Sequence, residues 1–460
     1  VKMSSSSPAS SNSNKTFTVD PTDNLSRGTK YKIRVTTGVR DRAGNTLTSQ
    51  YETSTGFTTL FTQQLGTSSN DSGDSVAVDS SNNIYVTGTS GGGLDNNTNS
   101  GYSDIILVKY NSSGTKQWTQ QLGTASNEFS LGVDVDSSDN IYVTGQTAGG
   151  LDGNTSAGLN DIFLVKYNSS GTKQWTQQLG TSSQDNGKSV AVDSSDNIYL
   201  TGITSGGLDN NTNSGLYDIF LVKYNSSGTK QWTQQLGTSS NDSANSVAVD
   251  SSNNIYVTGG TSGGLYGLNH GESDIFLVKY NSSGTKQWTK QLGTSSNDIA
   301  YGVTLDSSDN IYLTGTTGGG LDGNTSAGSD DIFLVKYNSS GTKQWTQQLG
   351  NLNGTVDYGY GVTVDSSDNI YVTGYTQGRF DGTTNSGGYD IFLVKYNSSG
   401  TYQWTQQLGT ASGDYANEVN IDSSENIYVT GLTYGGLDGN TNSGGSDIFL
   451  VKYNSDGVKQ

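Results

Sequence analysis

The sequence predicts an all-β protein built as a closed seven-bladed β-propeller of four-stranded antiparallel blades. Three observations lead to this prediction. A phrase of the form Trp-Thr-Gln-Gln-Leu-Gly returns about every 57 residues, and each unit holds four segments with strand patterns. The last unit stops before its fourth segment, and that segment is all that the first unit supplies. Repeated four-stranded sheets are typical of a propeller, in which the first and last units of the chain can combine to form one blade. The copies open at Phe61, Trp118, Trp175, Trp232, Trp288, Trp345 and Trp404.

The second copy shows how one unit divides into strands. Leu131–Asp136 alternates apolar and polar residues, and Ile141–Gly145 is rich in β-branched and aromatic residues, as expected of half-buried strands. After a long loop, Asp161–Tyr167 is the most apolar segment and Lys173–Leu179 alternates again. Four antiparallel strands with local connections make one blade, ordered from the central channel outward.

The two chain ends predict how the ring closes. Asp447–Tyr453 is the third strand of the last unit, and Leu60–Leu65 carries the pattern of a fourth strand. We expect the two to pair, which leaves no unpaired strand edge in the ring. The alternative is that further repeats follow in a longer protein. The predicted domains are therefore residues 1–59 and a propeller at residues 60–460.

Composition limits the classes of function. The 460 residues include no cysteine, so disulfides and thiolate metal sites are excluded. The net charge is −18; residues 1–59 are basic, so the predicted ring is strongly acidic. An acidic ring repels nucleic acid and anionic lipid. No run of 18 apolar residues exists, so we expect no membrane insertion in this segment.

The repeat unit resembles a known family. Val-Asp-Ser-Ser-Asp-Asn-Ile-Tyr-Val-Thr-Gly, followed by Asp-Ile-Phe-Leu-Val-Lys-Tyr-Asn and then Trp, recurs with fixed spacing over residues 60–460. It is similar to the bacterial seven-bladed β-propeller repeat family known as SBBP. The resemblance implies a secreted or surface-attached bacterial or archaeal protein, often beside Ig-like modules, with no defined enzymatic activity and no agreed ligand.

Residues 1–59 follow a different pattern. Thr29–Thr36 has the pattern of a strand, Val39–Leu47 contains an Asp-x-x-Gly-Asn turn, and Phe57–Thr59 closes the segment. This resembles the second half of a bacterial Ig-like domain of the surface-layer type, a partial β-sandwich. The first strands are not recognisable in the Ser-rich stretch Met3–Asn14. Half a sandwich cannot bury its face alone, so either the chain is part of a longer one or a partner chain donates strands, which would build a filament.

The unit also predicts two unlike faces of the ring. The turns Asp-Ser-Ser-Asp/Asn-Asn and Asn-Ser-Ser-Gly, nearly constant between copies, share one face. The long loops and the linkers between blades share the other face, and they vary. The varying linkers include Ser126–Phe129, Gln184–Gly187, Asn351–Gly359 and Ser412–Tyr415. A ligand is expected on this variable face and at the channel mouth.

The long loops offer candidate calcium ligands. Each loop of the type Leu-Asp-Gly-Asn-Thr provides alternate oxygen atoms, as calcium loops do, although the spacing is not that of an EF-hand. The alternative is that the aspartate holds an Asx-type turn. The candidate metal ligands are Asp95, Asp152, Asp209, Asp322, Asp381 and Asp438.

The fourth copy departs from this loop pattern. Leu265–Glu272 contains Tyr266, His270 and Glu272 and no loop aspartate, which makes these three residues a candidate ligand contact. The alternative is drift in a duplicated loop. His270 is the only histidine, so a His-rich zinc site and a standard Ser-His-Asp arrangement are not expected.

These observations favour an extracellular or cell-surface structural or adhesion protein, part of a surface layer, matrix or filament, and not an enzyme. Its expected partners are other surface proteins, copies of itself or glycans, with no nucleic acid. The alternative is a glycan- or calcium-binding recognition module that uses the variable face. A polysaccharide hydrolase or lyase is the third hypothesis.

Overall fold

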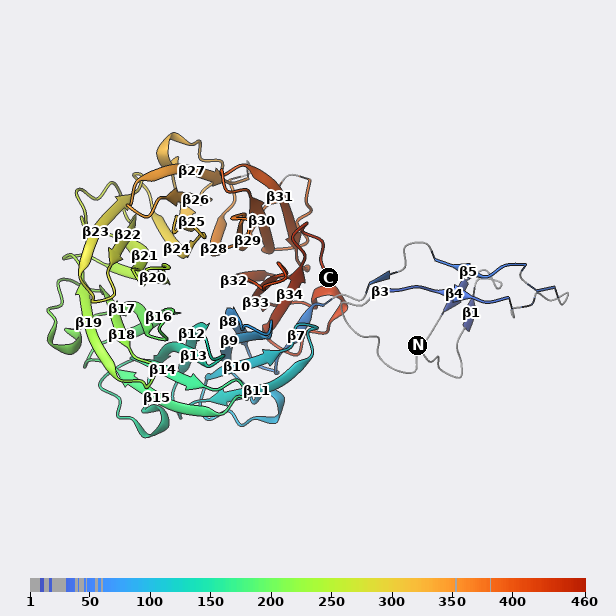
Figure 1. The fold of residues 1–460 in the computed structure, drawn as a ribbon, viewed down its shortest axis with the longest axis horizontal. Coiled ribbons are helices and arrows are strands. Elements are labelled where there is room, and N and C mark those ends of the chain that lie inside the picture. The colour runs from blue at the N-terminus through green and yellow to red at the C-terminus, as the bar shows by residue number, and fades with distance from the viewer. Residues whose placement is uncertain are drawn as a thin grey trace.

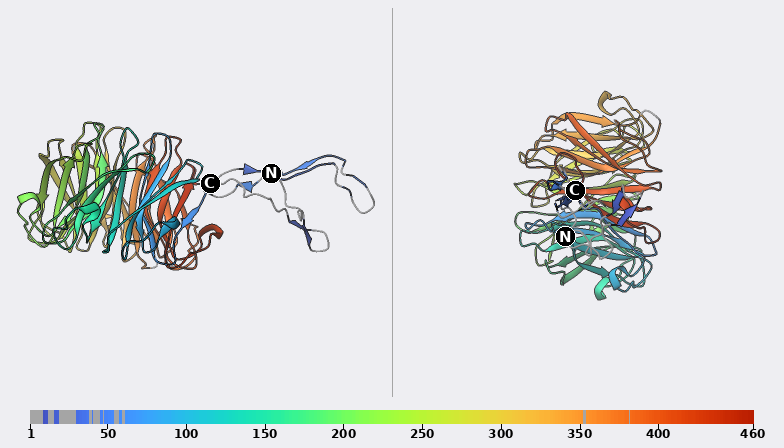
Figure 2. Two further views of the ribbon diagram at one scale, coloured as in Figure 1. Left: turned by 90° about the horizontal axis from the view of Figure 1, so that it is seen from below. Right: turned by 90° about the vertical axis from the view of Figure 1, so that its right-hand side faces the viewer.

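The computed structural model describes residues 9–11, 16–18, 30–37, 40, 45–46, 48–53, 57–58, 61–351, 354–380 and 382–460. Over the described part of residues 61–460, the chain forms a ring of seven four-stranded antiparallel sheets around a central channel (Figure 1). Seen edge-on, the strands run between two faces that carry the turns and loops (Figure 2). The predicted seven-bladed propeller is confirmed.

Each blade begins with a strand beside the channel, followed by a second strand that pairs with it. The inner strands are β8 (Asp71–Val78), β12 (Glu128–Val135), β16 (Asp185–Val192), β20 (Asp242–Val249), β24 (Asp298–Leu305), β28 (Asp357–Val364) and β32 (Asp414–Ile421). The second strands are β9 (Ile84–Ser90), β13 (Ile141–Thr147), β17 (Ile198–Thr204), β21 (Ile255–Thr261), β25 (Ile311–Thr317), β29 (Ile370–Thr376) and β33 (Ile427–Thr433).

The third and outer strands complete the sheets. The third strands are β10 (Asp104–Tyr110), β14 (Asp161–Tyr167), β18 (Asp218–Tyr224), β22 (Asp274–Tyr280), β26 (Asp331–Tyr337), β30 (Asp390–Tyr396) and β34 (Asp447–Tyr453). The outer strands are β11 (Lys116–Leu122), β15 (Lys173–Leu179), β19 (Lys230–Leu236), β23 (Lys286–Leu292), β27 (Lys343–Leu349), β31 (Tyr402–Leu408) and β7 (Gln63–Leu65). Short 3₁₀ turns lie at Leu94–Asn96, Leu151–Gly153, Leu208–Asn210, Leu321–Gly323 and Leu437–Gly439. Blade 1 is β8–β11, the next blades follow in order, and blade 7 is β32–β34 with β7.

The ring closes through the first strand of the propeller segment. β7 adds to β34 as the outer strand of blade 7, with Leu65 opposite Ile448 and Gln63 opposite Leu450. The backbone N–H of Phe61 also donates a hydrogen bond to the carbonyl of Gln460. The predicted pairing of residues 60–65 with Asp447–Tyr453 is confirmed for Gln63–Leu65. Leu60 lies outside the described residues.

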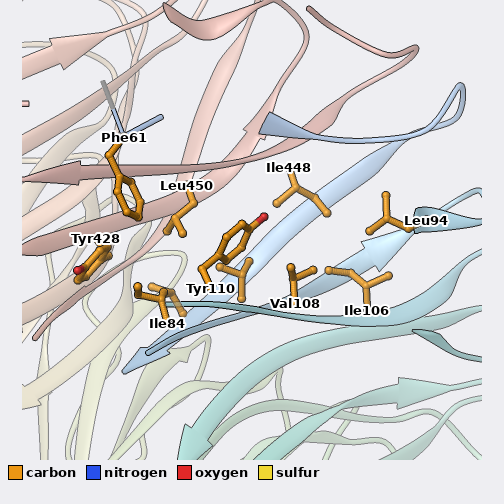
Figure 3. Close-up of a cluster of buried hydrophobic side chains, with 11 residues drawn as sticks. Phe61, Ile84, Leu94, Ile106, Val108, Tyr110, Tyr428, Ile448 and Leu450 are labelled. Atoms are coloured by element: carbon orange, nitrogen blue, oxygen red, sulfur yellow. The ribbon is translucent and has the colours of Figure 1, made fainter. Parts of the chain in front are cut away.

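Phe61 takes the place that tryptophan has in the other blades. In blade 1 the rings of Tyr85 and Trp118 lie 6.0 Å apart, and Phe61 lies 5.8 Å from Tyr428 in blade 7. Figure 3 shows Phe61 beside Tyr428 and Leu450, in a cluster that continues to Ile84 of blade 1. The hydrophobic core therefore runs across the junction where the chain ends meet.

The third strands are buried on both faces because neighbouring blades pack face to face. In Asp161–Tyr167 every residue except Lys166 is buried. Lys166 extends its ammonium group to the carbonyl of Ser226 in the next blade, at 3.2 Å. The same contact recurs around the ring and crosses the closure, where Lys452 donates to the carbonyl of Ser112 at 3.3 Å.

Paired buried carboxylates tie the loops of the variable face. Between blades 2 and 3, Asp161 accepts hydrogen bonds from the Ala157 backbone and the Gln178 side chain, both at 2.8 Å. Asp185 accepts from the Thr181 backbone at 2.6 Å. Both aspartates have no exposed surface. Each pair thus fixes one long loop and one linker, since buried carboxylates require donors.

The inner strands begin earlier than the sequence analysis predicted. β12 starts at Glu128 rather than Leu131, so Glu128 and Phe129 belong to the strand and not to the linker. The carboxylate of Glu128 is buried and accepts a hydrogen bond from the backbone of Thr124 at 2.7 Å. The polar side chain of Glu128 predicted an exposed linker. The prediction was wrong because a hydrogen bond from the Thr124 backbone allows this carboxyl group to be buried.

The described N-terminal residues form three short strand pairs, drawn outside the ring in Figure 1. They are β1 (Ala9–Ser11) with β2 (Thr16–Thr18), β3 (Lys30–Tyr31) with β6 (Phe57–Thr58), and β4 (Arg34–Val35) with β5 (Tyr51–Glu52). The predicted strand Thr29–Thr36 is therefore divided. At Ile33 the backbone N–H donates to the side-chain oxygen of Thr53 at 3.1 Å, which replaces a ladder hydrogen bond.

Ring closure predicts the effect of a Gly66→Ala substitution. A Cβ atom at Gly66 would lie 2.0 Å from Oδ1 and 2.5 Å from Cγ of the buried Asp447. Overpacking of this kind lowers the free energy of unfolding by about 1–3 kcal/mol. Calorimetry should show a lower melting temperature. The control is Gly388→Ala, whose Cβ has no neighbour nearer than 3.9 Å; equal melting temperatures of the two variants would contradict the account.

Candidate functional site

The inner strands each carry one bulge, and the bulges face the channel. The pairing between β8 and β9 shifts between Gly73 and Ser75, so Asp74 has no partner residue opposite it. A bulge redirects one side chain out of the regular alternation. The equivalent residues all line the channel, and they differ from blade to blade. They are Asp74, Leu131, Lys188, Asn245, Tyr301, Tyr360 and Asn417.

The channel encloses a cavity of about 670 Å³, within the size range of small-molecule sites. All seven inner strands contribute to its wall. Besides the residues at the bulges, Asp134 and Glu418 lie on this wall, at positions where most other copies have small or neutral residues. The wall therefore combines acids, one lysine, three asparagines and two tyrosines.

Burial changes the protonation of the acids in the channel. It raises the pKa of Asp74 and of Asp134 to about 6, although each accepts hydrogen bonds. Burial also raises the pKa of Glu418 to about 8, so this carboxyl group carries a proton at neutral pH. Burial lowers the pKa of Lys188, and the charge of Asp74 opposes that change. Perturbed groups gathered in a cavity are typical of functional sites.

A tyrosine cluster lies beside the channel on the variable face. Of the 27 tyrosines, 14 recur at two fixed positions in all seven blades, and 11 others in the ring occupy positions that are not tyrosine in most blades. Seven of those 11, all within the described residues, form one connected set of ring contacts across blades 5–7. We call this set the tyrosine cluster. It consists of Tyr301, Tyr358, Tyr360, Tyr375, Tyr389, Tyr415 and Tyr434.

The cluster runs from the channel wall to the exposed rim. Tyr301 and Tyr360, both at bulges, are stacked with ring centroids 4.6 Å apart. Tyr360 stacks on Tyr375 at 5.5 Å, and Tyr375 meets Tyr415 edge-on at 4.8 Å. Tyr415 contacts Tyr434, whose side chain is 48% exposed. Four ring contacts thus join the channel to the rim, in the geometries that aromatic pairs favour.

Burial keeps four phenol groups of the cluster protonated. Burial raises the pKa of Tyr358 to about 12 and raises the pKa of Tyr301, Tyr360 and Tyr375 as well. The hydroxyl of Tyr358 donates to Asp330 at 3.3 Å. The cluster therefore offers apolar ring faces together with hydroxyl groups that both donate and accept.

The five predicted calcium ligands that the structure describes lie at the outer edge of the ring, each in a different blade. Asp209 pairs with the ammonium group of Lys230 and accepts a hydrogen bond from Thr233, both on the outer strand. Asp95, Asp152, Asp322 and Asp438 make equivalent pairs with Lys116, Lys173, Lys343 and Lys459. Asp381 lies outside the described residues.

These aspartates do not converge on one point, because each belongs to a different blade. Among the described residues, no three carboxylate, cysteine or histidine side chains are grouped to hold a metal ion. Calcium binding stays a prediction of the sequence, and it would require displacement of a lysine in each of the five described loops.

The three candidate contact residues of the fourth copy each interact with a different neighbouring side chain. Tyr266 is 60% exposed, with the ammonium group of Lys290 5.9 Å from its ring centre. His270 Nδ1 lies 2.9 Å from the buried carboxylate of Asp274. Glu272 accepts a hydrogen bond from Asn297 at 2.7 Å. A ligand contact there also stays a prediction.

Sequence analysis singled out the variable face and the channel mouth, but it did not identify the residues that gather there. Tyr358 and Tyr415 lie in two of the linkers identified as variable, Asn351–Gly359 and Ser412–Tyr415. The residues at the bulges were missed. An internal alignment of the copies contains the signal, since Asp, Leu, Lys, Asn, Tyr, Tyr and Asn occupy one position of otherwise similar strands.

Comparison with known families agrees with this architecture. Residues 60–95, 117–152, 174–209, 231–267, 287–322, 344–381 and 403–438 match the family described as a beta-propeller repeat, SBBP. These matches cover more than half of the chain. The chain belongs to the SBBP family. Residues 2–59 match the bacterial Ig-like domain, so the predicted resemblance of both parts is confirmed.

Two curated proteins are similar to this SBBP chain. One is the uncharacterized WD repeat-containing protein L264 of Acanthamoeba polyphaga mimivirus, 25% identical over 81% of this chain and 36% of its own length. The other is the regulatory protein FlaEY of Caulobacter vibrioides, 25% identical over 47% of this chain and 26% of its own length. The chain spans about a quarter to a third of the length of these relatives.

A solved structure corrects one prediction. An ulvan lyase, a polysaccharide lyase of family PL25, matches 86% of this chain and 97% of its own with a TM-score of 0.50 and 12% identity. At this identity the likeness concerns the fold. The prediction that the protein is not an enzyme is wrong, because it relied on the propeller being only a scaffold, and this enzyme has such a fold.

The bacterial Ig-like domain indicates an extracellular or cell-surface protein, as the sequence predicted. In the described part of the chain, no helix has both the length and the apolar character needed to cross a membrane.

The buried acids predict that stability falls as the pH rises. Burial raises the pKa of Asp357 and Asp74 to about 6 and that of Glu418 to about 8, above the values of about 4 in an unfolded chain. The folded state therefore binds more protons between these values. This contribution to stability is complete below about pH 4 and is lost as the pH rises through 6 to 8. The melting temperature should be higher at pH 5.5 than at pH 8.

The substitution Glu418→Gln tests whether ionisation of Glu418 causes the loss of stability at high pH. The substitution should reduce the loss of melting temperature between pH 7 and pH 9, because it removes the group that ionises there. The matched control is Glu272→Gln on the exposed rim, which should keep the profile of the original chain. A melting temperature that stays constant or rises from pH 5.5 to pH 8 would show that the buried acids are already ionised.

Proposed function

We propose that this protein recognises saccharide chains outside the cell, and that it holds them across the tyrosine cluster and the channel mouth. The observation that carries the proposal is the cluster itself. Seven aromatic side chains that the repeat does not require lie together on one side of the variable face. Repetition supplies a uniform scaffold, so departures that gather at one place point to a ligand.

The chemistry of the cluster suits sugar rings. A pyranose has faces of C–H groups that pack against aromatic rings, while its hydroxyl groups need hydrogen-bonding partners at the edge. Tyrosine provides both in one side chain. The adjoining channel adds Asn245 and Asn417 on its wall, and amide groups pair with hydroxyl donors and acceptors alike.

The position of the cluster also favours an extended ligand. Tyr301 and Tyr360 lie on the channel wall, whereas Tyr434 is exposed at the rim. A ligand in contact with both ends must cross parts of three blades. A saccharide chain of several residues meets this requirement, and a single small molecule does not. Adhesion to a saccharide-coated surface would follow from such binding.

The proposal can be tested with a panel of soluble polysaccharides in affinity electrophoresis and calorimetry. The original chain should bind at least one of them. Tyr415→Ala and Tyr434→Ala should each weaken binding about 5- to 30-fold, since aromatic contacts of this kind contribute about 1–2 kcal/mol. The same incubations can be analysed for shortened chains, which would reveal an enzymatic activity.

The matched control is Tyr102→Ala, a tyrosine that is 77% exposed on the variable face of blade 1. It should leave the affinity unchanged. Loss of binding in this control to the same degree, or no binding of any polysaccharide by the original chain, would refute the proposal.

A further inference from the structure

Lys188 stands out among the groups of the channel because its charge has no direct partner. It occupies the bulge of β16 in blade 3 and is half-buried. Among the described residues that line the channel, it is the one basic side chain. Its ammonium group makes no hydrogen bond and has no carboxylate within 4.0 Å in the described part of the chain. An unpaired ammonium group in a partly dehydrated cavity is costly.

The acids of the channel, in contrast, have local partners. Asp134 accepts backbone N–H groups of Val135 and Val192, both at 2.8 Å. Asp74 accepts a hydrogen bond from the hydroxyl of Ser72 at 2.7 Å, and the amide of Asn417 approaches it at 3.4 Å. These two carboxylates therefore do not need a cation from a ligand.

Glu418 differs from both of these acids. One of its oxygens accepts the backbone N–H of Val419 at 3.0 Å. Burial raises the pKa of this carboxyl group to about 8, so at neutral pH it is a hydrogen-bond donor rather than a charge. Besides the hydrogen-bonded carboxylates of Asp74 and Asp134, the channel thus presents one ammonium group without an ion pair and one neutral acid group. Both of these groups can donate hydrogen bonds to an anionic oxygen group.

We infer that the terminal residue of the bound saccharide carries an anionic group, a carboxylate or a sulfate ester, and that this group pairs with Lys188 inside the channel. The inference depends on the proposed saccharide function and specifies the ligand. A chain that follows the tyrosine cluster inward reaches the stacked pair Tyr301 and Tyr360 at the level of the bulges. Lys188 lies at the same level on another part of the wall. An end of the chain that enters this cavity therefore shares it with the ammonium group of Lys188.

The overall charge of −18 does not oppose this contact strongly. Charges on the surface are screened beyond about 8 Å at physiological ionic strength, whereas a pair inside a cavity is screened much less. The electrostatic potential at Lys188 depends mainly on the carboxylate of Asp74. This carboxylate already accepts hydrogen bonds from Ser72 and Asn417.

The test uses the oligosaccharide that binds most tightly in the panel, prepared with three different terminal residues. One form ends in a uronic acid, one in the corresponding neutral sugar, and one in a sulfated sugar. Calorimetry with the original chain should show at least about tenfold tighter binding of an anionic form than of the neutral form. The two anionic forms show which group the site prefers.

Lys188→Met should abolish that preference and leave the affinity for the neutral form within about twofold. Lys188→Arg should retain the preference because it keeps the positive charge. Lys286→Met is the matched control, since Lys286 is exposed at the start of outer strand β23, and it should behave as the original chain. Melting temperatures establish that each variant is folded.

The outcomes separate this inference from the proposed function. Saccharide binding with equal affinity for anionic and neutral ends would overturn the inference and leave the proposed function standing. A preference that survives in Lys188→Met would likewise overturn it. Failure to bind any saccharide would refute the proposed function and the inference together.

Discussion

The antiparallel pairing of β7 with β34 is the contact on which the rest of the structure depends. Three residue pairs join the beginning of the propeller segment to its end. Because of this pairing, blade 7 lies against blade 1, so that Asn417 donates to the carbonyl of Gly73 at 3.0 Å. The same closure allows Lys452 to reach Ser112 and continue the ring of lysine contacts between blades. Without it the inner strands would not enclose a channel.

Repetition explains the stability of this ring, and departures from repetition explain its specificity. The third strands and the turns of the constant face are nearly identical between copies, and their buried contacts recur in each blade. The bulge of the inner strand allows variation at low cost. Its side chain leaves the regular pattern and faces the channel. The same position can therefore hold Asp74 in blade 1, Lys188 in blade 3 and Tyr301 in blade 5 without a change in the packing between blades.

Sequence periodicity predicted the fold because each strand is encoded locally. Asp161–Tyr167 and Lys173–Leu179 agree with β14 and β15 at both ends. The start of β12 was not predictable, because the burial of Glu128 depends on the backbone of Thr124. The ion pairs of the loop aspartates were not predictable for the same reason. Asp209 and Lys230 are 21 residues apart in the sequence and meet only when the loop folds against the outer strand.

The candidate site was less accessible to sequence analysis for a geometric reason. Tyr301 and Tyr434 are separated by more than 130 residues, and only the ring brings their blades together. Lys188 and Glu418 likewise belong to blades that are far apart in the sequence and share the channel wall. Sequence analysis could identify the variable face, but the convergence of particular side chains required the closed ring and the bulges.

The central claim is that one side of the variable face, from Tyr434 to the channel, holds a saccharide chain. The most direct measurement is a crystal structure of the protein with a bound oligosaccharide. The account predicts sugar rings against Tyr375, Tyr389 and Tyr415, with one end of the chain in the channel. A ligand bound at the constant face, or at the outer edge beside the pairs of lysine and loop aspartate, would contradict it.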